Sequence, residues 1–330
     1  MAAACATGSE IHAIPIDTPW AVGSVNVYLL DRDPLTLVDA GQRSPEALAQ
    51  LEAGLRAAGR RVEDLERIVL THQHIDHTGL AATLIERSGA ELCALDLVAE
   101  WMASFPASLD AEDDFAEDLL RRHGVGPKAA VVGAHRGGQG FGDAAEVSRV
   151  LSDRDVLAFS DGELRVLHRP GHSPFDTVFH DEERGILFGG DHVLRWPSTP
   201  IMSPPLGDGD RNGRPRAFAA YQASLRATAL LEVETLLPGH GRPVARHRET
   251  IESRLRRYER ITDETAAALT REPRTAAEIA AELKGGVPDT TAFFLLCDVL
   301  GHIDELIDAG RAIEQVDADG VSRFAAVDDV

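Results

Sequence analysis

The chain has 330 residues, of which 44% are hydrophobic and 26% charged, a composition typical of a globular protein with one large domain and a small one. Its net charge of −21 disfavours non-specific binding to nucleic acid, because such binding needs a surface rich in Lys and Arg. No run approaches the roughly 20 apolar residues of a membrane span, the start of the chain lacks the pattern of a secretory signal, and the three cysteines imply no disulfide framework. We therefore expect a cytoplasmic protein that acts away from membranes.

The amino-terminal part predicts strands followed by a helix. Apolar runs broken by Pro and Gly indicate strands at residues 11–16, 25–30, 35–39 and 68–70, and a helix at residues 45–58. Asp39 ends the third strand. As a polar residue shortly before a helix, it is a candidate helix cap.

A dense polar motif follows the strand at 68–70. His72, His74, Asp76 and His77 lie where this strand gives way to a helix that begins near Gly79. In extended backbone the imidazole rings of His72 and His74 lie on the same side of the chain. The side chains of Asp76 and His77 follow on the bend into the helix, where they can be directed at a second position close to the first. One metal could bind the first pair and a second metal the other. Imidazole and carboxylate ligands suit zinc, iron or manganese. The alternative, a hydrogen-bonded polar turn, is disfavoured because buried imidazoles without partners are costly.

Residues 97–150 depart from the strand–helix alternation. Leu97 to His123 predicts one or two amphipathic helices, and a glycine-rich stretch at 137–142 follows. This helical insert could be a lid over the metals or an ordinary packed insert. The glycine-rich stretch lacks the Lys-Ser/Thr and the strand–helix context of a phosphate loop.

Three later turns place further histidine and aspartate residues at strand ends. Each is an apolar run that ends in Gly beside His or Asp, at His172, at Asp191 and at His240. With the first motif they supply five histidines and two aspartates, enough for two metals. Each turn alone is a weak signal, but the set in this order is specific.

The whole set resembles the ligand pattern of the metallo-β-lactamase superfamily, over roughly residues 10 to 248. The resemblance implies a four-layer αββα sandwich, an α/β fold, with two divalent metal ions, zinc before iron or manganese. It also implies that Asp191 bridges the metals and that the Asp39 carboxylate orients a histidine ligand. The implied ligands are His72, His74 and His172 for the first metal, and Asp76, His77 and His240 for the second.

The stretch from Arg195 to Arg216 is rich in Pro and Gly and predicts a long loop beside the metals. Trp196 and Met202 are candidate substrate contacts there. The four arginines of this loop could bind a phosphate or carboxylate on the substrate, or could simply be solvated. They are Arg195, Arg211, Arg214 and Arg216.

The last eighty or so residues predict three helices and a hairpin, which resembles a winged helix. We therefore expect a catalytic domain at 1–248 and a winged-helix domain at 249–330. The third helix, Thr290 to Ala309, contains acidic residues but no Lys or Arg, so it should not bind duplex DNA. Its apolar residues should instead pack on the catalytic domain or on a second subunit, which leaves a homodimer open.

The residues indicate a binuclear metallohydrolase with Asp76 as the residue that orients the nucleophile and accepts its proton. Two cations lower the pKa of water to about 7, so that a metal-bound hydroxide is available. We expect it to attack a thioester or ester of a small molecule, as in the glyoxalase II branch. RNA cleavage, as in the winged-helix endoribonuclease branch, and lactone hydrolysis are alternatives. A metal-stabilised binding module is disfavoured, because a structural site needs no open coordination position.

Overall fold

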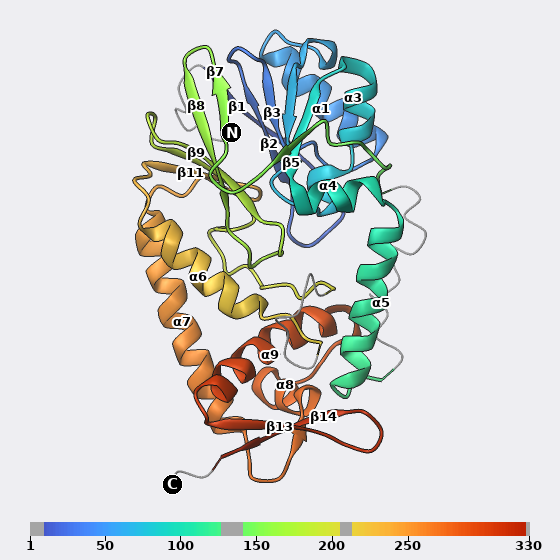
Figure 1. The fold of residues 1–330 in the computed structure, drawn as a ribbon, viewed down its shortest axis with the longest axis vertical. Helices are drawn as coiled ribbons and strands as arrows, with labels where there is room; N and C mark the ends of the chain where they lie inside the picture. Colours follow the sequence, from blue (N-terminus) through green and yellow to red (C-terminus); the bar gives the residue numbers. More distant parts are fainter. Residues whose placement is uncertain (1–9, 127–140, 205–212, 328–330) are drawn as a thin grey trace.

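The computed structural model describes residues 10–126, 141–204 and 213–327, and two facing β-sheets form its upper part (Figure 1). The first sheet is antiparallel from β1 to β3 and parallel from β3 to β6. Its strands, in spatial order, are β1 (Ile11–Ile16), β2 (Val25–Leu30), β3 (Thr36–Val38), β4 (Arg67–Val69), β5 (Glu91–Leu95) and β6 (Arg149–Leu151).

The second sheet is antiparallel except at one edge, where β10 and β11 run parallel. Its spatial order is β11 (Thr235–Pro238), β10 (Ile186–Gly190), β9 (Thr177–Asp181), β8 (Gly162–His168) and β7 (Val156–Phe159). Alternate residues of a strand face opposite sides. Accordingly Phe188 packs between the sheets, whereas Leu187 packs on the outer face.

Helices cover both outer faces, which completes the four αββα layers and confirms the predicted fold class. On the first sheet lie α1 (Pro45–Ala57) and α3 (Ala81–Ser88), and on the second α6 (Ala217–Ala229) and α7 (His247–Ala268). Helix α1 begins where the sequence provides a cap: the Ser44 side chain accepts a hydrogen bond from the Ala47 amide. Strand β2 is buried along its whole length because both of its faces are covered.

The helical insert packs against two different cores. Helix α4 (Asp96–Ala103) lies on the first sheet, where Trp101 and Met102 join the core. Helix α5 (Ala107–Arg122) continues along the right side of Figure 1 to the lower end of the molecule. There Leu119 and Leu120 are buried among residues of the C-terminal region. The described part of the insert is therefore packed along its length, and its role as a mobile lid stays a prediction; most of the glycine-rich stretch lies outside the described residues.

The C-terminal region contains the predicted helices and hairpin in the predicted order. They are α7, α8 (Ala276–Lys284), α9 (Ala292–Asp308), β13 (Ala312–Val316) and β14 (Ser322–Ala326). The short strand β12 (Arg274–Thr275) lies between α7 and α8 and pairs with β14. Thr275 and Glu278 form a reciprocal capping box at the start of α8. The assignment as a winged helix remains a prediction.

Helix α9 packs on the sandwich rather than standing clear of it. The rings of Phe218 in α6 and His302 in α9 lie 4.5 Å apart. Helix α7 joins both parts, since Ile251 packs on the second sheet and Ala268 packs in the C-terminal cluster. The predicted boundary at 248/249 thus falls near the start of one helix shared by two cores.

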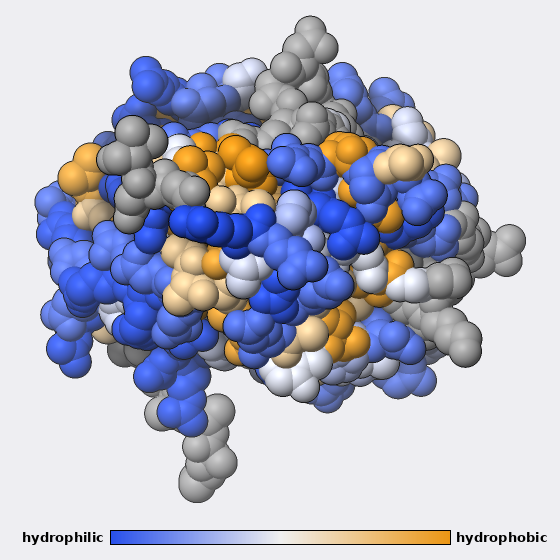
Figure 2. Space-filling model, turned by 90° about the horizontal axis from the view of Figure 1, so that it is seen from below, coloured by the Kyte–Doolittle hydropathy of each residue, from blue (hydrophilic) through white to orange (hydrophobic). Residues whose placement is uncertain are grey.

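Viewed from the C-terminal end, the surface shows hydrophobic patches separated by hydrophilic side chains (Figure 2). Exposed apolar side chains of this region include Phe294, Ile313 and Val316. A homodimer stays a prediction. Among the described residues, none of the helices has the length and apolar character needed to cross a bilayer.

Candidate metal centre

The candidate ligands lie at the carboxyl ends of four strands. Strands β8 and β10 are both antiparallel to β9, and β11 is parallel to β10, so β8, β10 and β11 point in one direction. Their ends therefore deliver His172, Asp191 and His240 to one edge of the second sheet. The end of β4 brings the first motif from the facing sheet, and the backbone bond from Thr177 N to Thr71 O (2.8 Å) connects the two.

Three histidine nitrogens form the first group of potential ligands. His74 Nδ1 lies 2.9 Å from His72 Nε2 and 3.1 Å from His172 Nε2. The nitrogens point at a common space, and such a set suits a transition-metal cation.

The second group comprises Asp76, His77 and His240, whose ligand atoms also converge. His240 Nε2 lies 3.2 Å from Asp76 Oδ2. Asp191 reaches both groups: its Oδ2 is 3.5 Å from His172 Nε2 and 3.4 Å from His240 Nε2, and its Oδ1 is 3.5 Å from His77 Nε2. All seven sequence-predicted ligand residues are thus brought together.

The opposite nitrogen of four histidine rings is held by another part of the protein. These second contacts fix the orientation of each ring, which directs Nε2 into the site. The pairs are His72 Nδ1 with Thr71 Oγ1 (3.0 Å), His77 Nδ1 with Asp39 Oδ2 (2.8 Å), His172 Nδ1 with Ser198 Oγ (2.9 Å) and His240 Nδ1 with Ser24 O (2.9 Å).

Three buried polar atoms of the site have no hydrogen-bond partner among the described residues. They are His77 Nε2, His240 Nε2 and Asp191 Oδ1. Unpaired buried polar atoms are costly. A cation bound to all three would remove this cost, so the residues present fit divalent metal ions.

Burial and neighbouring charges determine the protonation of these histidines. Burial, reinforced by His172, lowers the pKa of His74 to about 3, and burial lowers that of His172 to about 4. Both are therefore neutral at pH 7, the form that binds a metal. Burial also lowers the pKa of His77, but the carboxylates of Asp39, Asp76 and Asp191 outweigh it and raise that pKa to about 10. The second group thus favours a positive charge at its centre.

The metallo-beta-lactamase superfamily model matches residues 20–240, which include every strand of the two facing sheets except β1 and every candidate ligand. This chain belongs to the metallo-beta-lactamase superfamily. The superfamily implies divalent metal ions, in agreement with the histidine and aspartate groups described above.

Known proteins similar to the chain include hydrolases. The probable metallo-hydrolase YqjP of Bacillus subtilis (strain 168) is 30% identical over 312 residues, 93% of this chain and 95% of that protein. Acyl-coenzyme A thioesterase MBLAC2 of Homo sapiens is 31% identical over 183 residues, 51% of this chain and 58% of that protein. A beta-lactamase domain protein of Burkholderia ambifaria has a TM-score of 0.81 at 25% identity, covering 97% of this chain and 93% of that one. The chain is therefore a hydrolase of this superfamily.

Asp39 lies against the candidate ligand His77 and does not cap helix α1, which Ser44 caps. Its carboxylate also accepts hydrogen bonds from the amide and the hydroxyl of Thr71. Asp39→Asn should lower metal affinity and hydrolysis by roughly 10- to 100-fold, because the amide loses the charge that fixes the His77 ring. Chelator competition and initial rates measure both effects.

The control for this variant is Asp31→Asn, which neutralises a partly exposed carboxylate paired with Arg60, away from the candidate ligands. It should leave both quantities unchanged. Parental metal affinity in Asp39→Asn would show that this carboxylate does not orient the ligand.

Two glycines allow close approaches at the centre. A Cβ on Gly239 would collide with an Asp191 oxygen and lie 2.7 Å from His77 Cε1, so only glycine fits beneath the ligands. A Cβ on Gly241 would lie 2.7 Å from the Trp196 ring. The exposed Trp196 side chain therefore lies on the turn that carries His240, and Arg195 beside it is also exposed. The interpretation of Trp196 and Arg195 as substrate contacts stays a prediction.

The structure gives other residues of this loop different roles. Arg214 is 0% exposed and pairs with Asp304 (2.6 Å) and Glu314 (3.2 Å), while Arg216 pairs with Asp308. Arg214 is therefore neither solvated nor offered to a substrate, whereas the Arg216 side chain stays partly exposed in its pair with Asp308. Met202 is 2% exposed within the C-terminal cluster. Arg211 lies outside the described residues.

Sequence reasoning missed a contact between the insert and the metal motif. Glu112 of α5 accepts hydrogen bonds from Gln73 Nε2 (3.1 Å) and Trp101 Nε1 (3.2 Å), and Gln73 lies between two candidate ligand histidines. Burial raises the pKa of Glu112 to about 7 despite these donors. No local pattern marks this residue, because the contact spans 39 positions of the chain.

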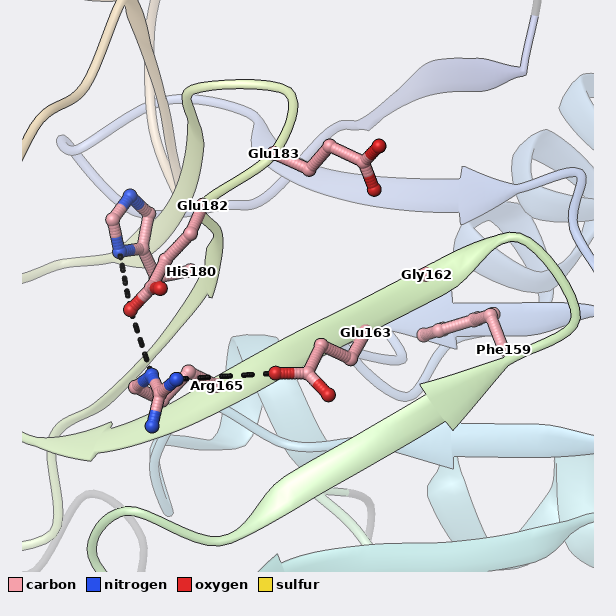
Figure 3. Close-up of a pocket in the computed structure, with 7 residues that line it drawn as sticks. All are labelled: Phe159, Gly162, Glu163, Arg165, His180, Glu182 and Glu183. Atoms are coloured by element: carbon pink, nitrogen blue, oxygen red, sulfur yellow. Dashed lines mark hydrogen bonds and ion pairs between the residues drawn. The ribbon is translucent and has the colours of Figure 1, made fainter.

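A separate hollow of about 510 Å³ lies at the opposite ends of the second-sheet strands (Figure 3). Its charged side chains largely pair with one another: Arg165 Nε is 2.7 Å from Glu182 Oε1. Since Gly162 begins β8 and His172 follows its end, this hollow is distant from the metal centre along the strand.

Proposed function

We propose that the chain is a binuclear metal-dependent hydrolase that cleaves the thioester, or an ester, of a small acyl group. The observation that carries this proposal is the convergence of two ligand groups on Asp191, with buried ligand atoms that lack protein partners. The similarity to MBLAC2, an acyl-coenzyme A thioesterase, supports the choice of a thioester.

The donor sets indicate which residues hold each metal. We assign His72, His74 and His172 to one cation and Asp76, His77 and His240 to the other, with Asp191 shared. Imidazole and carboxylate donors without thiolate suit zinc, with iron or manganese as alternatives. When bound, the two cations supply a nucleophilic hydroxide at neutral pH and polarise the carbonyl to be cleaved.

The protein's own residues direct the proton and the leaving group. Asp76 is 9% exposed, so its carboxylate lies at the edge of the site where it can orient the nucleophile and then accept its proton. A thiol with a pKa near 8.5 leaves readily as a thiolate. A thioester therefore needs no general acid, which agrees with a centre whose titratable residues are all assigned as ligands.

RNA is the second candidate substrate, and the charge of the protein disfavours it. The net charge is −21, and residues 250–330 contain 17 Asp and Glu against 9 Lys and Arg. A polyanion would have to approach against this field.

One metal-loaded preparation should be assayed against acyl-coenzyme A, acyl-glutathione, a lactone and single-stranded RNA. We expect thioester turnover that a chelator abolishes and added metal restores. Metal-dependent RNA cleavage without thioester turnover, lost in His74→Ala, would reverse the choice of substrate.

A further inference from the structure

A basic groove of about 860 Å³ lies between helix α7 and the loop that follows Asp191. Its lining contains six arginines and a single acidic residue, Glu249, in a protein whose net charge is −21. Such a local concentration of positive charge attracts anions. The arginines are Arg195, Arg246, Arg254, Arg256, Arg257 and Arg260.

The spacing of these residues places them along one stripe of α7, the long helix on the left of Figure 1. From the N-cap Arg246 onward, Glu249, Ser253, Arg257 and Arg260 follow at the three- and four-residue intervals that share a helix face. With a rise of 1.5 Å per residue, the stripe is about 21 Å long. This length can present several guanidinium groups to one extended ligand.

Among the described residues, four of the six arginines have no carboxylate partner. Arg195, Arg257 and Arg260 make no ion pair there, and Arg254 donates to backbone carbonyls instead. Arg246 and Arg256 have only exposed pairs, with Glu249 and Glu252, which contribute little to stability. Folding alone therefore does not explain why the guanidinium groups gather here.

Arg254 binds the loop that follows Asp191, and this loop connects the groove to the candidate metal centre. Arg254 is 4% exposed, and its Nη2 donates hydrogen bonds to the carbonyls of Leu194 (2.6 Å) and Trp196 (2.7 Å). The same loop continues to Ser198, whose hydroxyl lies 2.9 Å from His172 Nδ1. A ligand in the groove thus contacts the segment that positions a candidate metal ligand.

We infer that this groove binds the phosphate groups of a nucleotide-type acyl carrier, the chemistry of coenzyme A, while its thioester reaches the metal centre. The inference rests on the proposed thioesterase function. Guanidinium groups bind phosphate through paired hydrogen bonds. The groove volume of about 860 Å³ is within the range of sites for small molecules.

The lining of the groove disfavours RNA as its ligand. Grooves for single-stranded nucleic acid combine positive charge with aromatic side chains on which bases stack. The residues that line this groove are Arg, Glu, Pro, Val, Ala, Thr and Ser, with no aromatic side chain among them.

Calorimetric titration with free coenzyme A and with pantetheine, which lacks the phosphates, tests the groove without any turnover. In Arg257→Ala/Arg260→Ala the Kd for coenzyme A should rise about 10- to 100-fold, because two charged hydrogen-bonding groups are lost. Arg56→Ala/Arg61→Ala is the matched control, since it removes two exposed guanidiniums from other surfaces and should leave this Kd unchanged. The Kd for pantetheine should be the same in all three proteins.

Kinetics then separate this inference from the proposed function. In the groove variant the ratio of kcat/KM for acyl-coenzyme A to that for acyl-pantetheine should fall about 10-fold or more, mainly through KM. Arginine-dependent binding of coenzyme A without thioester hydrolysis would support the groove and refute the proposed function. If the groove variant hydrolyses thioesters, and its Kd for coenzyme A and its ratio of kcat/KM values equal those of the parent, the inference about the groove is refuted and the proposed function is not. Tighter binding of a single-stranded RNA than of coenzyme A through the same two arginines would also overturn the inference.

Discussion

His74→Ala and Asp191→Ala should each lower hydrolysis by roughly 10³-fold or more, beyond the ~10- to 100-fold typical of residues that only orient a ligand. His74 Nδ1 lies within 3.1 Å of both other nitrogens of the first group. Asp191 contacts nitrogens of both groups through its two oxygens. Loss of His74 should therefore deplete one metal, whereas loss of Asp191 should weaken both.

Elemental analysis after dialysis measures this difference directly. The parent should retain about two metals per chain, His74→Ala about one, and Asp191→Ala fewer than the parent at both positions. His12→Ala is the control, because His12 lies on β1 outside the groups of potential ligands. Full metal content in His74→Ala would contradict the ligand assignment.

Arg214→Ala should destabilise the protein by about 3–5 kcal/mol, because it leaves buried carboxylates without their cation. The Arg214 guanidinium donates to both oxygens of Asp304 and to both oxygens of Glu314. The side chains of Asp304 and Glu314 are only 4% and 5% exposed. The loop after Asp191 would thus lose its attachment to α9 and β13.

Urea denaturation followed by circular dichroism measures this effect. The control is Arg216→Ala, whose partner Asp308 is 44% exposed, and it should cost no more than about 1 kcal/mol. Neutralising all three residues, as Arg214→Met with Asp304→Asn and Glu314→Gln, should recover much of the loss, since the uncompensated charges are then absent. Equal stability of Arg214→Ala and Arg216→Ala would show that the buried pair contributes nothing.

Local patterns in the sequence determined the composition of the candidate centre, and the superfamily resemblance that these patterns carry implied the fold class. The two-residue spacing of His72 and His74, and the Gly-linked His or Asp after three later strands, depend on neighbouring positions alone. The reciprocal caps of Thr275 and Glu278 likewise lie within one helical turn. Each of these features is therefore readable from a few consecutive residues.

Only the tertiary structure decided what surrounds the centre. Arg195 and Arg257 line one groove although 62 positions separate them in the chain, and Arg214 is buried because carboxylates from α9 and β13 meet it. From the sequence, Arg195 and Arg214 had the same expected role, as loop arginines that bind substrate or are solvated. In the structure Arg195 is exposed, whereas Arg214 is fully buried. Burial and ion pairing depend on which distant segments pack together, and neighbouring residues carry no information about that.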